Sequence, residues 1–259
     1  MAKYKIGVTE AGDAGLDLSW QEKLKTVDGA VVITKCVSPA FYKAALANKD
    51  KLIIHATITG YGHSVLEPNV PAPYDEFEAI MSLVEDGFPK EKIVIRVDPI
   101  IPTAKGLDKA KNVITTFMDK GFSRFRVSII DMYKHVKARF KAAGLPLPYG
   151  ESGFAPSPEQ VQQVDMMLCE VTKYWQLLVS QGIASGELRI ECCAEPGLKN
   201  TIHCGCISAY DLTLLGLPED AGADSVGYQR PACMCYSGKT ELLNNKQRCA
   251  HGCLYCYWH

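Results

Sequence analysis

The sequence predicts an α/β fold in which short buried strands alternate with helices. Six segments rich in β-branched residues recur along residues 1–195, and segments with apolar residues three and four positions apart lie between them. Consecutive βα units form either an open doubly wound sheet or a barrel. Residues 7–12, after the first strand, lack the glycine spacing of a dinucleotide-binding loop. We therefore predict a partial (β/α)6 barrel of the TIM type, with a cysteine-rich C-terminal segment folding over its mouth.

The six expected strands have nearly continuous apolar centres, as in parallel strands that are covered on both faces. They are Tyr4–Thr9, Ala30–Lys35, Lys51–Ile58, Lys92–Ile100, Arg124–Asp131 and Glu187–Glu195.

Four helices are expected between these strands from the spacing of their apolar residues. They are Pro39–Asn48, Pro73–Asp86, Lys105–Lys120 and Ser157–Ser180. The last one begins with Ser-Pro-Glu-Gln, which predicts a capping box with proline in the first turn. Residues 143–158 are expected to form a long loop within the barrel and not a domain boundary. We therefore expect residues 1–195 to form the barrel and residues 196–259 to form a segment of the same domain.

The composition narrows the class of protein. A chain of 259 residues with 47% apolar and 22% charged residues is not a disordered protein. A net charge of −1 argues against a strongly basic nucleic-acid coat. No apolar run approaches the roughly 20 residues that span a bilayer, and the N-terminus does not resemble a signal peptide. We therefore expect a cytoplasmic protein with no membrane segment.

The cysteines are clustered. Nine of the eleven lie between Cys192 and Cys256, and only Cys36 and Cys169 lie outside that stretch. Secreted disulfide proteins are usually short and spread their cysteines along the chain, whereas intracellular thiols stay reduced and available as ligands. The clustering therefore indicates metal or redox chemistry.

The tail contains the most specific motif, Cys-x3-Cys-x2-Cys, formed by Cys249, Cys253 and Cys256. Three thiolates at this spacing can bind three irons of a [4Fe–4S] cluster and leave the fourth open to a small molecule. With an aromatic residue at Tyr255, this is the signature of radical S-adenosylmethionine (SAM) enzymes, in which that aromatic lies against the adenine. The alternatives are a zinc site with His251 as fourth ligand, and unliganded buried thiols.

A second set of cysteines precedes the tail. We predict that Cys193, Cys206, Cys233 and Cys235 bind an auxiliary Fe–S cluster, or else a structural zinc ion. Cys192 and Cys204 would be packing residues. The alternative is that all of these thiols are simply buried.

Polar residues gather at the carboxyl ends of the expected strands, where barrel enzymes build their active sites. The candidates for binding SAM or substrate are Thr34, Lys35, Thr57, Thr59, Asp98, Ser128, Asp131 and Glu195. Arg96 is the candidate for gripping a carboxylate of SAM or substrate, with an ion pair to Asp98 as its alternative. Tyr61 and Tyr133 are candidates for delivering or quenching a hydrogen atom. The alternative is that both tyrosines are simply packing residues.

Several segments together carry a family resemblance through about 80% of the chain. They are residues 33–35, 57–62, 66–71, 96–100, 130–134, 193–195, 206–207, 230–235 and 249–257. In these the chain resembles the bacterial and phage family called domain of unknown function 1848, regarded as related to spore photoproduct lyase within the radical SAM group. The resemblance implies a radical SAM barrel with a C-terminal cluster motif. It also implies that the second site uses Cys193, Cys206, Cys233 and Cys235.

The chain departs from that family after the first strand, where the family usually reads Ser-Arg-Arg-Thr-Asp. Residues 8–13 here read Val-Thr-Glu-Ala-Gly-Asp and contain no arginine. Whatever the family binds with its arginine pair is expected to be bound differently in this chain.

The function expected from the motif and the resemblance is reductive cleavage of SAM, followed by hydrogen abstraction by a 5′-deoxyadenosyl radical. The resemblance suggests a substrate such as a modified thymine in phage-type DNA, in a bacterial cell or phage-infected host. The basic run Lys134–Lys141 would then make a transient DNA contact, unless it is a solvated amphipathic helix. A flavodoxin-type or ferredoxin-type protein would donate the electron. The alternatives are a free amino acid or small metabolite as substrate, and a non-catalytic zinc or Fe–S module.

Overall fold

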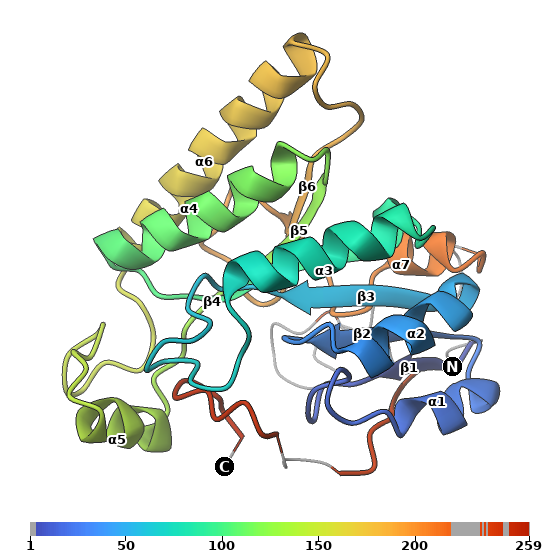
Figure 1. Ribbon diagram of the computed structural model, residues 1–259. Helices are drawn as coiled ribbons and strands as arrows, with labels where there is room; N and C mark the ends of the chain where they lie inside the picture. Colours follow the sequence, from blue (N-terminus) through green and yellow to red (C-terminus); the bar gives the residue numbers. More distant parts are fainter. Residues whose placement is uncertain (1–3, 219–233, 235, 237, 246–248, 259) are drawn as a thin grey trace.

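The chain folds around one parallel sheet. The computed structural model describes residues 4–218, 234, 236, 238–245 and 249–258. Its eight strands are parallel and follow the order β7-β6-β5-β4-β3-β2-β1-β8 (Figure 1). They are β1 (Ile6–Val8), β2 (Gly29–Thr34), β3 (Leu52–Thr57), β4 (Ile93–Ile100), β5 (Arg124–Ile129), β6 (Arg189–Cys192), β7 (Ile202–His203) and β8 (Lys239–Glu241).

The predicted α/β class is confirmed, and all six expected strands are present. The prediction of six strands was incomplete, because β7 and β8 extend the two edges of the sheet from the segment after residue 195. From β1 to β7 the strand order follows the sequence and shows no reversal of the kind that defines a doubly wound sheet.

Helices follow most of the strands. They are α1 (Trp20–Lys23), α2 (Pro39–Ala47), α3 (Pro73–Glu85), α4 (Ala104–Met118), α5 (Lys134–Ala142), α6 (Pro158–Ser180) and α7 (Ala209–Leu214), with short 3-10 turns at Leu24–Thr26, Lys49–Lys51 and Lys90–Lys92. The predicted capping box of α6 is confirmed, since Ser157 accepts a hydrogen bond from the Gln160 amide and the Gln160 side chain accepts one from the Ser157 amide. No helix in the described ranges has the length and apolar character that a membrane crossing requires.

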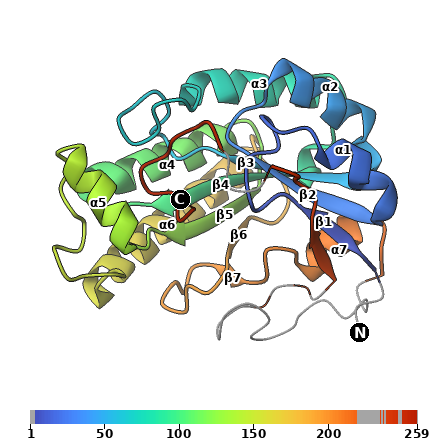
Figure 2. The ribbon, with the colours of Figure 1, turned by 90° about the horizontal axis from the view of Figure 1, so that it is seen from below.

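One face of the sheet is covered by helices. The main hydrophobic core contains large side chains from each of α1, α2, α3, α4 and α6, packed against strands β2 to β6 (Figures 1 and 2). They include Trp20, Phe41, Ile80, Phe117 and Trp175. Burial of large apolar groups is the main source of stability for such a layer, at roughly 25 cal/mol per Å².

The opposite face of the sheet carries a second, smaller core and then turns polar. Val31, Ile53 and Val94 pack there against Ile207 and Leu212. Residues two positions apart on a strand point to the same face. Further along the strands, the residues on this face are polar. The expectation of apolar strands on both faces was therefore wrong for the halves of β3 to β6 that lie nearest their carboxyl ends.

Candidate active site

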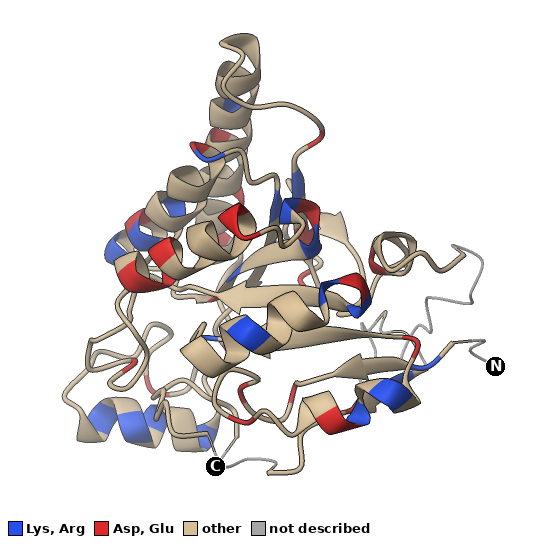
Figure 3. Ribbon diagram, turned by 45° about the vertical axis from the view of Figure 1, so that its right-hand side comes forward, with Lys and Arg blue, Asp and Glu red and all other residues tan. Residues whose placement is uncertain are grey.

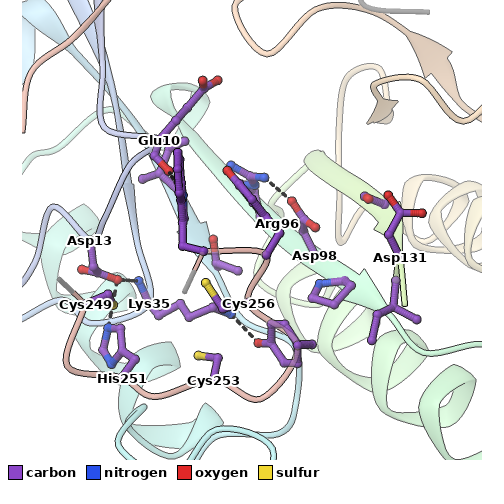
Figure 4. Close-up of a pocket in the computed structure, with 18 of the residues that line it drawn as sticks. Glu10, Asp13, Lys35, Arg96, Asp98, Asp131, Cys249, His251, Cys253 and Cys256 are labelled. Atoms are coloured by element: carbon purple, nitrogen blue, oxygen red, sulfur yellow. Dashed lines mark hydrogen bonds and ion pairs between the residues drawn. The ribbon is translucent and has the colours of Figure 1, made fainter. Parts of the chain in front are cut away.

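A cavity of about 790 Å³ opens at the carboxyl ends of the strands. The loops after β1 and β2, the ends of β3, β4 and β5, and residues 249–258 of the tail all contribute to its wall (Figure 4). Figure 2 shows the tail lying across this end of the sheet. The cavity therefore combines the strand-end residues and the cysteine motif that the sequence singled out separately.

The tail is fixed by backbone contacts with the loop after β3. The Leu254 amide donates to the Leu66 carbonyl at 3.0 Å, and the Asn69 amide donates to the His251 carbonyl at 3.3 Å. The Asn69 side chain also donates to the Ala250 carbonyl at 2.8 Å. These bonds set the position of the motif independently of any ligand.

The three thiols of the motif, Cys249, Cys253 and Cys256, line the same cavity (Figure 4). Burial raises the pKa of Cys253 to about 12, and the negative charge of Glu67 and of the other two thiols adds to this effect against the opposing charge of Lys35. Each thiol thus lies within electrostatic range of the others. A metal cation is the ordinary means of stabilising such closely placed thiolates.

The motif supplies three thiols to one cavity, and thiolates are ligands that both zinc ions and Fe–S clusters take. Within the described part of the chain, no three His, Cys, Asp or Glu side chains are close enough to hold one metal ion.

Asp13, in the loop after β1, connects three parts of the site. Its carboxylate accepts hydrogen bonds from the Lys35 amide at 2.6 Å, the Thr34 hydroxyl at 2.7 Å and the Gly15 amide at 2.8 Å. It also accepts from His251 Nε2 at 2.9 Å. A buried carboxylate with four donors is fully compensated, and here it joins the ends of β1 and β2 to the tail.

Both ring nitrogens of His251 face oxygen acceptors. Nδ1 lies 3.1 Å from the Asn69 carbonyl, and Nε2 lies against the Asp13 carboxylate. Both bonds can form only if the ring is protonated at both nitrogens. Burial opposes that charge, but the bond to Asp13 outweighs it and raises the pKa of His251. In this structure both nitrogens of His251 are occupied by the Asn69 carbonyl and the Asp13 carboxylate.

Tyr255 is held from outside the motif. Its hydroxyl donates a short hydrogen bond to the buried carboxylate of Glu67. Lys35 Nζ donates to the same Glu67 oxygen at 2.9 Å and to the Tyr255 oxygen at 2.8 Å. The Tyr255 ring is therefore fixed at the cavity wall, and Lys35 has one remaining N–H donor for a ligand.

Arg96 forms an ion pair with Asp98, as its alternative interpretation expected (Figure 4). Both residues still line the cavity. The two side chains neutralise each other. If the pair opens, Arg96 can bind a ligand carboxylate and Asp98 can bind a ligand ammonium group.

Most of the predicted site residues meet at this cavity. Those that line it are Thr34, Lys35, Thr57, Arg96, Asp98, Ser128, Asp131, Tyr133, Cys193, Cys206, Cys249, Cys253, Tyr255 and Cys256.

Of the predicted residues that the structure describes, three do not line the cavity. Tyr61 is buried in the small core beneath the tail, where Lys109 lies over its ring. The Thr59 hydroxyl is buried and accepts a hydrogen bond from the Tyr61 amide. Glu195 accepts hydrogen bonds from the Ile129 amide and the Ser128 hydroxyl, and so supports the end of β5 from behind. These positions suit packing and support better than contact with a ligand.

The described cysteines of the second set lie in two different environments. Cys193 and Cys206 line the cavity. Cys192 is buried in the main core, and Cys204 accepts a hydrogen bond from Arg126 at 3.3 Å. The remaining predicted ligands, Cys233 and Cys235, lie outside the described residues.

The sequence analysis missed several residues of the site. Glu10, Asp13, Arg126, Arg139 and His251 all line the cavity without having been chosen as binding or catalytic residues. The signal for Arg126 was the alternation of Arg-Phe-Arg-Val-Ser in β5, which places charged and apolar side chains on opposite faces. The other four lie in loops, a helix and the tail, where no periodicity identifies them.

A buried ionic network lies beneath the cavity. Glu191 contacts Arg124 at 3.2 Å and Arg126 at 2.8 Å, and Asp211 contacts Arg124 at 2.6 Å. Burial opposes ionisation of Glu191, but the two guanidinium groups outweigh it and lower its pKa to about 2. On the same face His55 is buried with neither ring nitrogen hydrogen-bonded; burial and the nearby arginines hold its pKa well below the usual value, so its ring is neutral.

Fold and site together define a parallel α/β protein with a cysteine-lined cavity at the carboxyl ends of its strands. The chain belongs to the family described as domain of unknown function (DUF1848), which matches residues 18–258. No curated protein and no solved structure matched the chain.

Proposed function

We propose that the protein is a radical SAM enzyme. When bound, a [4Fe–4S] cluster at Cys249, Cys253 and Cys256 supplies the electron that splits SAM into methionine and a 5′-deoxyadenosyl radical, the species that abstracts hydrogen from the substrate. The observation that carries this proposal is the placement of the three thiols on one wall of the large strand-end cavity. The family match does not support any particular activity, because the description of the family names none.

The remaining residues of the cavity would bind and orient the two substrates. Lys35 is fixed by Glu67 and Tyr255 and has one donor left for a carboxylate. Arg96 can offer a carboxylate a second cation if its bond to Asp98 opens. Asp13 and His251 hold the tail across the cavity, which limits the access of water to a reactive species.

We also propose that the sheet is a partial barrel. Support comes from the strand order, which follows the sequence from β1 to β7, and from the inner face of β1 to β4, whose side chains share one small core with Ile207 and Leu212.

For the substrate we propose a nucleobase-sized group, with a modified thymine as first candidate and a free amino acid or small metabolite as second. The cavity volume of about 790 Å³ lies within the usual range for small-molecule sites, roughly 300–1,000 Å³. Tyr133 and Tyr257 line it and are partly exposed, so they present aromatic surface on which a base can stack.

Cys193 and Cys206 are proposed ligands of a second centre, an Fe–S cluster or a zinc ion, facing the same cavity. A centre at that place would lie close to the substrate and to Arg96 and Arg126, whose pKa values the Cys206 thiol helps to raise.

The experiment is anaerobic purification with iron, sulfide and zinc analysis, followed by electron paramagnetic resonance after dithionite reduction, with and without SAM. We expect iron and sulfide in the wild type and a spectrum that changes when SAM is added. Cys253→Ala should lose that signal, whereas Cys169→Ala, on α6 and away from the cavity, should keep it. Zinc without iron after anaerobic reconstitution would reject the proposal and favour a non-catalytic zinc module.

A further inference from the structure

Helix α5 concentrates positive charge beside the tail. Lys134–Ala142 contains three lysines, one arginine and no acidic residue, in a chain whose net charge is only −1. Figure 3 shows the helix as a blue stretch next to the end of the tail. Lys134, Lys137 and Lys141 share one face of the helix and form a basic patch, whereas Arg139 faces the tail.

The helix is joined directly to the cysteine motif. Arg139 donates to the carbonyl of Cys256 at 2.8 Å and to that of Trp258 at 3.0 Å. Val136 and Phe140 also face the tail, and they belong to the small core that contains Cys253 and Tyr255. The basic patch is therefore the outer surface of the structure that holds the three thiols.

Among the residues that the structure describes, acidic groups neutralise the patch only weakly. Lys141 forms an ion pair with Glu151, but the two side chains are 52% and 75% exposed. Such exposed pairs contribute on the order of 0–1 kcal/mol and yield readily to another partner. Lys137 donates to the Glu151 carbonyl, which carries no net charge. Most of the positive charge on α5 is thus available to a docking molecule.

We infer that the basic patch on α5 is the docking site of an acidic one-electron carrier protein, such as a flavodoxin. The inference rests on the proposed function, which requires an external electron for each reductive cleavage. One electron leaves the reduced carrier and enters the centre held by Cys249, Cys253 and Cys256, and no atom is transferred. SAM and substrate occupy the cavity during that step, so the carrier must approach the motif from outside, where α5 lies.

A nucleic acid is the competing partner for a basic helix. The contact between Arg139 and Cys256 favours the electron carrier, because it aligns the patch with a predicted cluster ligand. Complementary charge at such a surface increases the association rate by roughly 10- to 1,000-fold at low ionic strength. A carrier that docks in this way should bind less well as salt screens the patch.

The test compares Lys134→Glu/Lys137→Glu/Lys141→Glu with a control of equal charge change, Lys25→Glu/Lys43→Glu/Lys173→Glu. The control positions are exposed and lie in or beside α1, α2 and α6. Arg139 is left intact because it touches the motif. Binding of a recombinant bacterial flavodoxin to the holoenzyme is measured by calorimetry at two salt concentrations, and binding of a single-stranded thymidine oligonucleotide is measured alongside. SAM cleavage is then driven either by reduced flavodoxin or by dithionite.

We expect the α5 variant to bind flavodoxin at least about tenfold more weakly than wild type and control, and to lose salt dependence. Its flavodoxin-driven cleavage should fall in proportion, while dithionite-driven cleavage stays unchanged. Equal flavodoxin binding by all three proteins would overturn the inference. Loss of oligonucleotide binding alone would assign the patch to nucleic acid instead. Failure of dithionite to cleave SAM in the wild type would reject the proposed function, and the calorimetry would still decide whether the carrier docks on α5.

Discussion

Asp13 and His251 are 238 positions apart in the chain and meet at 2.9 Å across the cavity wall. The carboxylate ties the cysteine motif to the ends of β1 and β2, because it also accepts from the Lys35 amide and the Thr34 hydroxyl. These hydrogen bonds fix the tail in the wall of the cavity.

The first prediction concerns this pair. Asp13→Asn keeps the shape of the side chain but removes the negative charge that accepts hydrogen bonds from His251, Lys35 and Thr34. Hydrogen bonds to charged groups contribute roughly 1.5–3 kcal/mol, so we expect the free energy of unfolding to fall by about 2 kcal/mol. The tail should also become a faster site of limited proteolysis. Asp75→Asn, at an exposed position of α3, is the control and should change neither measurement. An Asp13 variant with wild-type proteolysis would contradict the role given to Asp13.

The buried network beneath the cavity gives a second prediction. Glu191→Gln leaves Arg124 and Arg126 adjacent without the carboxylate that separates their charges. Breaking a buried ion pair by removing one partner costs about 3–5 kcal/mol, and we expect a loss of that size in chemical denaturation. Glu187→Gln is the matched control, because Glu187 is 74% exposed and contacts Arg189 only at 3.4 Å. Similar stabilities for both variants would show that the network is not a structural support.

Tyr255 and Glu67 allow a double-mutant cycle. Tyr255→Phe removes the hydroxyl that donates to Glu67 and leaves the aromatic ring in place. We expect a destabilisation of about 1–3 kcal/mol from the buried oxygen that loses its donor. Glu67→Gln should cost a comparable amount, and the double variant less than the sum of the two, since the pair is coupled. Strict additivity in thermal or urea unfolding would mean that the hydrogen bond contributes nothing of its own.

Glu76 on α3 gives a prediction about pH. Burial, together with the nearby Asp13, raises its pKa from 4.5 to about 7 against the opposing bond from the Val37 amide. The folded state therefore holds a proton that the unfolded state has already lost, and stability declines as pH rises from about 4.5 to 7. At 1.36 kcal/mol per unit, Glu76→Gln should gain about 2–3 kcal/mol relative to wild type between pH 5 and pH 8.

Unfolding of wild type, Glu76→Gln and the exposed control Glu78→Gln is followed by urea titration across that range. The control should stay parallel to the wild type at every pH. A stability difference between Glu76→Gln and wild type that does not change with pH would show that the Glu76 carboxyl ionises as it does in the unfolded chain.

The sequence predicted those parts of the molecule that depend on local patterns. The capping box at Ser157 and the β-branched runs of β2 to β5 are such patterns, and the structure contains them where expected. The three thiols of the tail were identified by spacing alone, and all of them reach the cavity.

The contacts that the sequence did not predict are long-range ones. Strand β8 has three residues and pairs with β1 from the far end of the chain, and no local pattern marks so short a strand. His251 was considered only as a metal ligand, because its partners Asp13 and Asn69 become its neighbours only in the folded state. Arg124 and Arg126 were overlooked because their strand was read as apolar on both faces, although its alternation places the two cations on one side.

The most direct test of the central claim is the formation of 5′-deoxyadenosine from SAM by the anaerobically reconstituted, dithionite-reduced protein. We expect wild type and Cys169→Ala to form 5′-deoxyadenosine and Cys253→Ala to form none. No product should appear without dithionite. Absence of 5′-deoxyadenosine from a wild-type protein that carries its full iron and sulfide would contradict the claim that this cavity is a radical SAM active site.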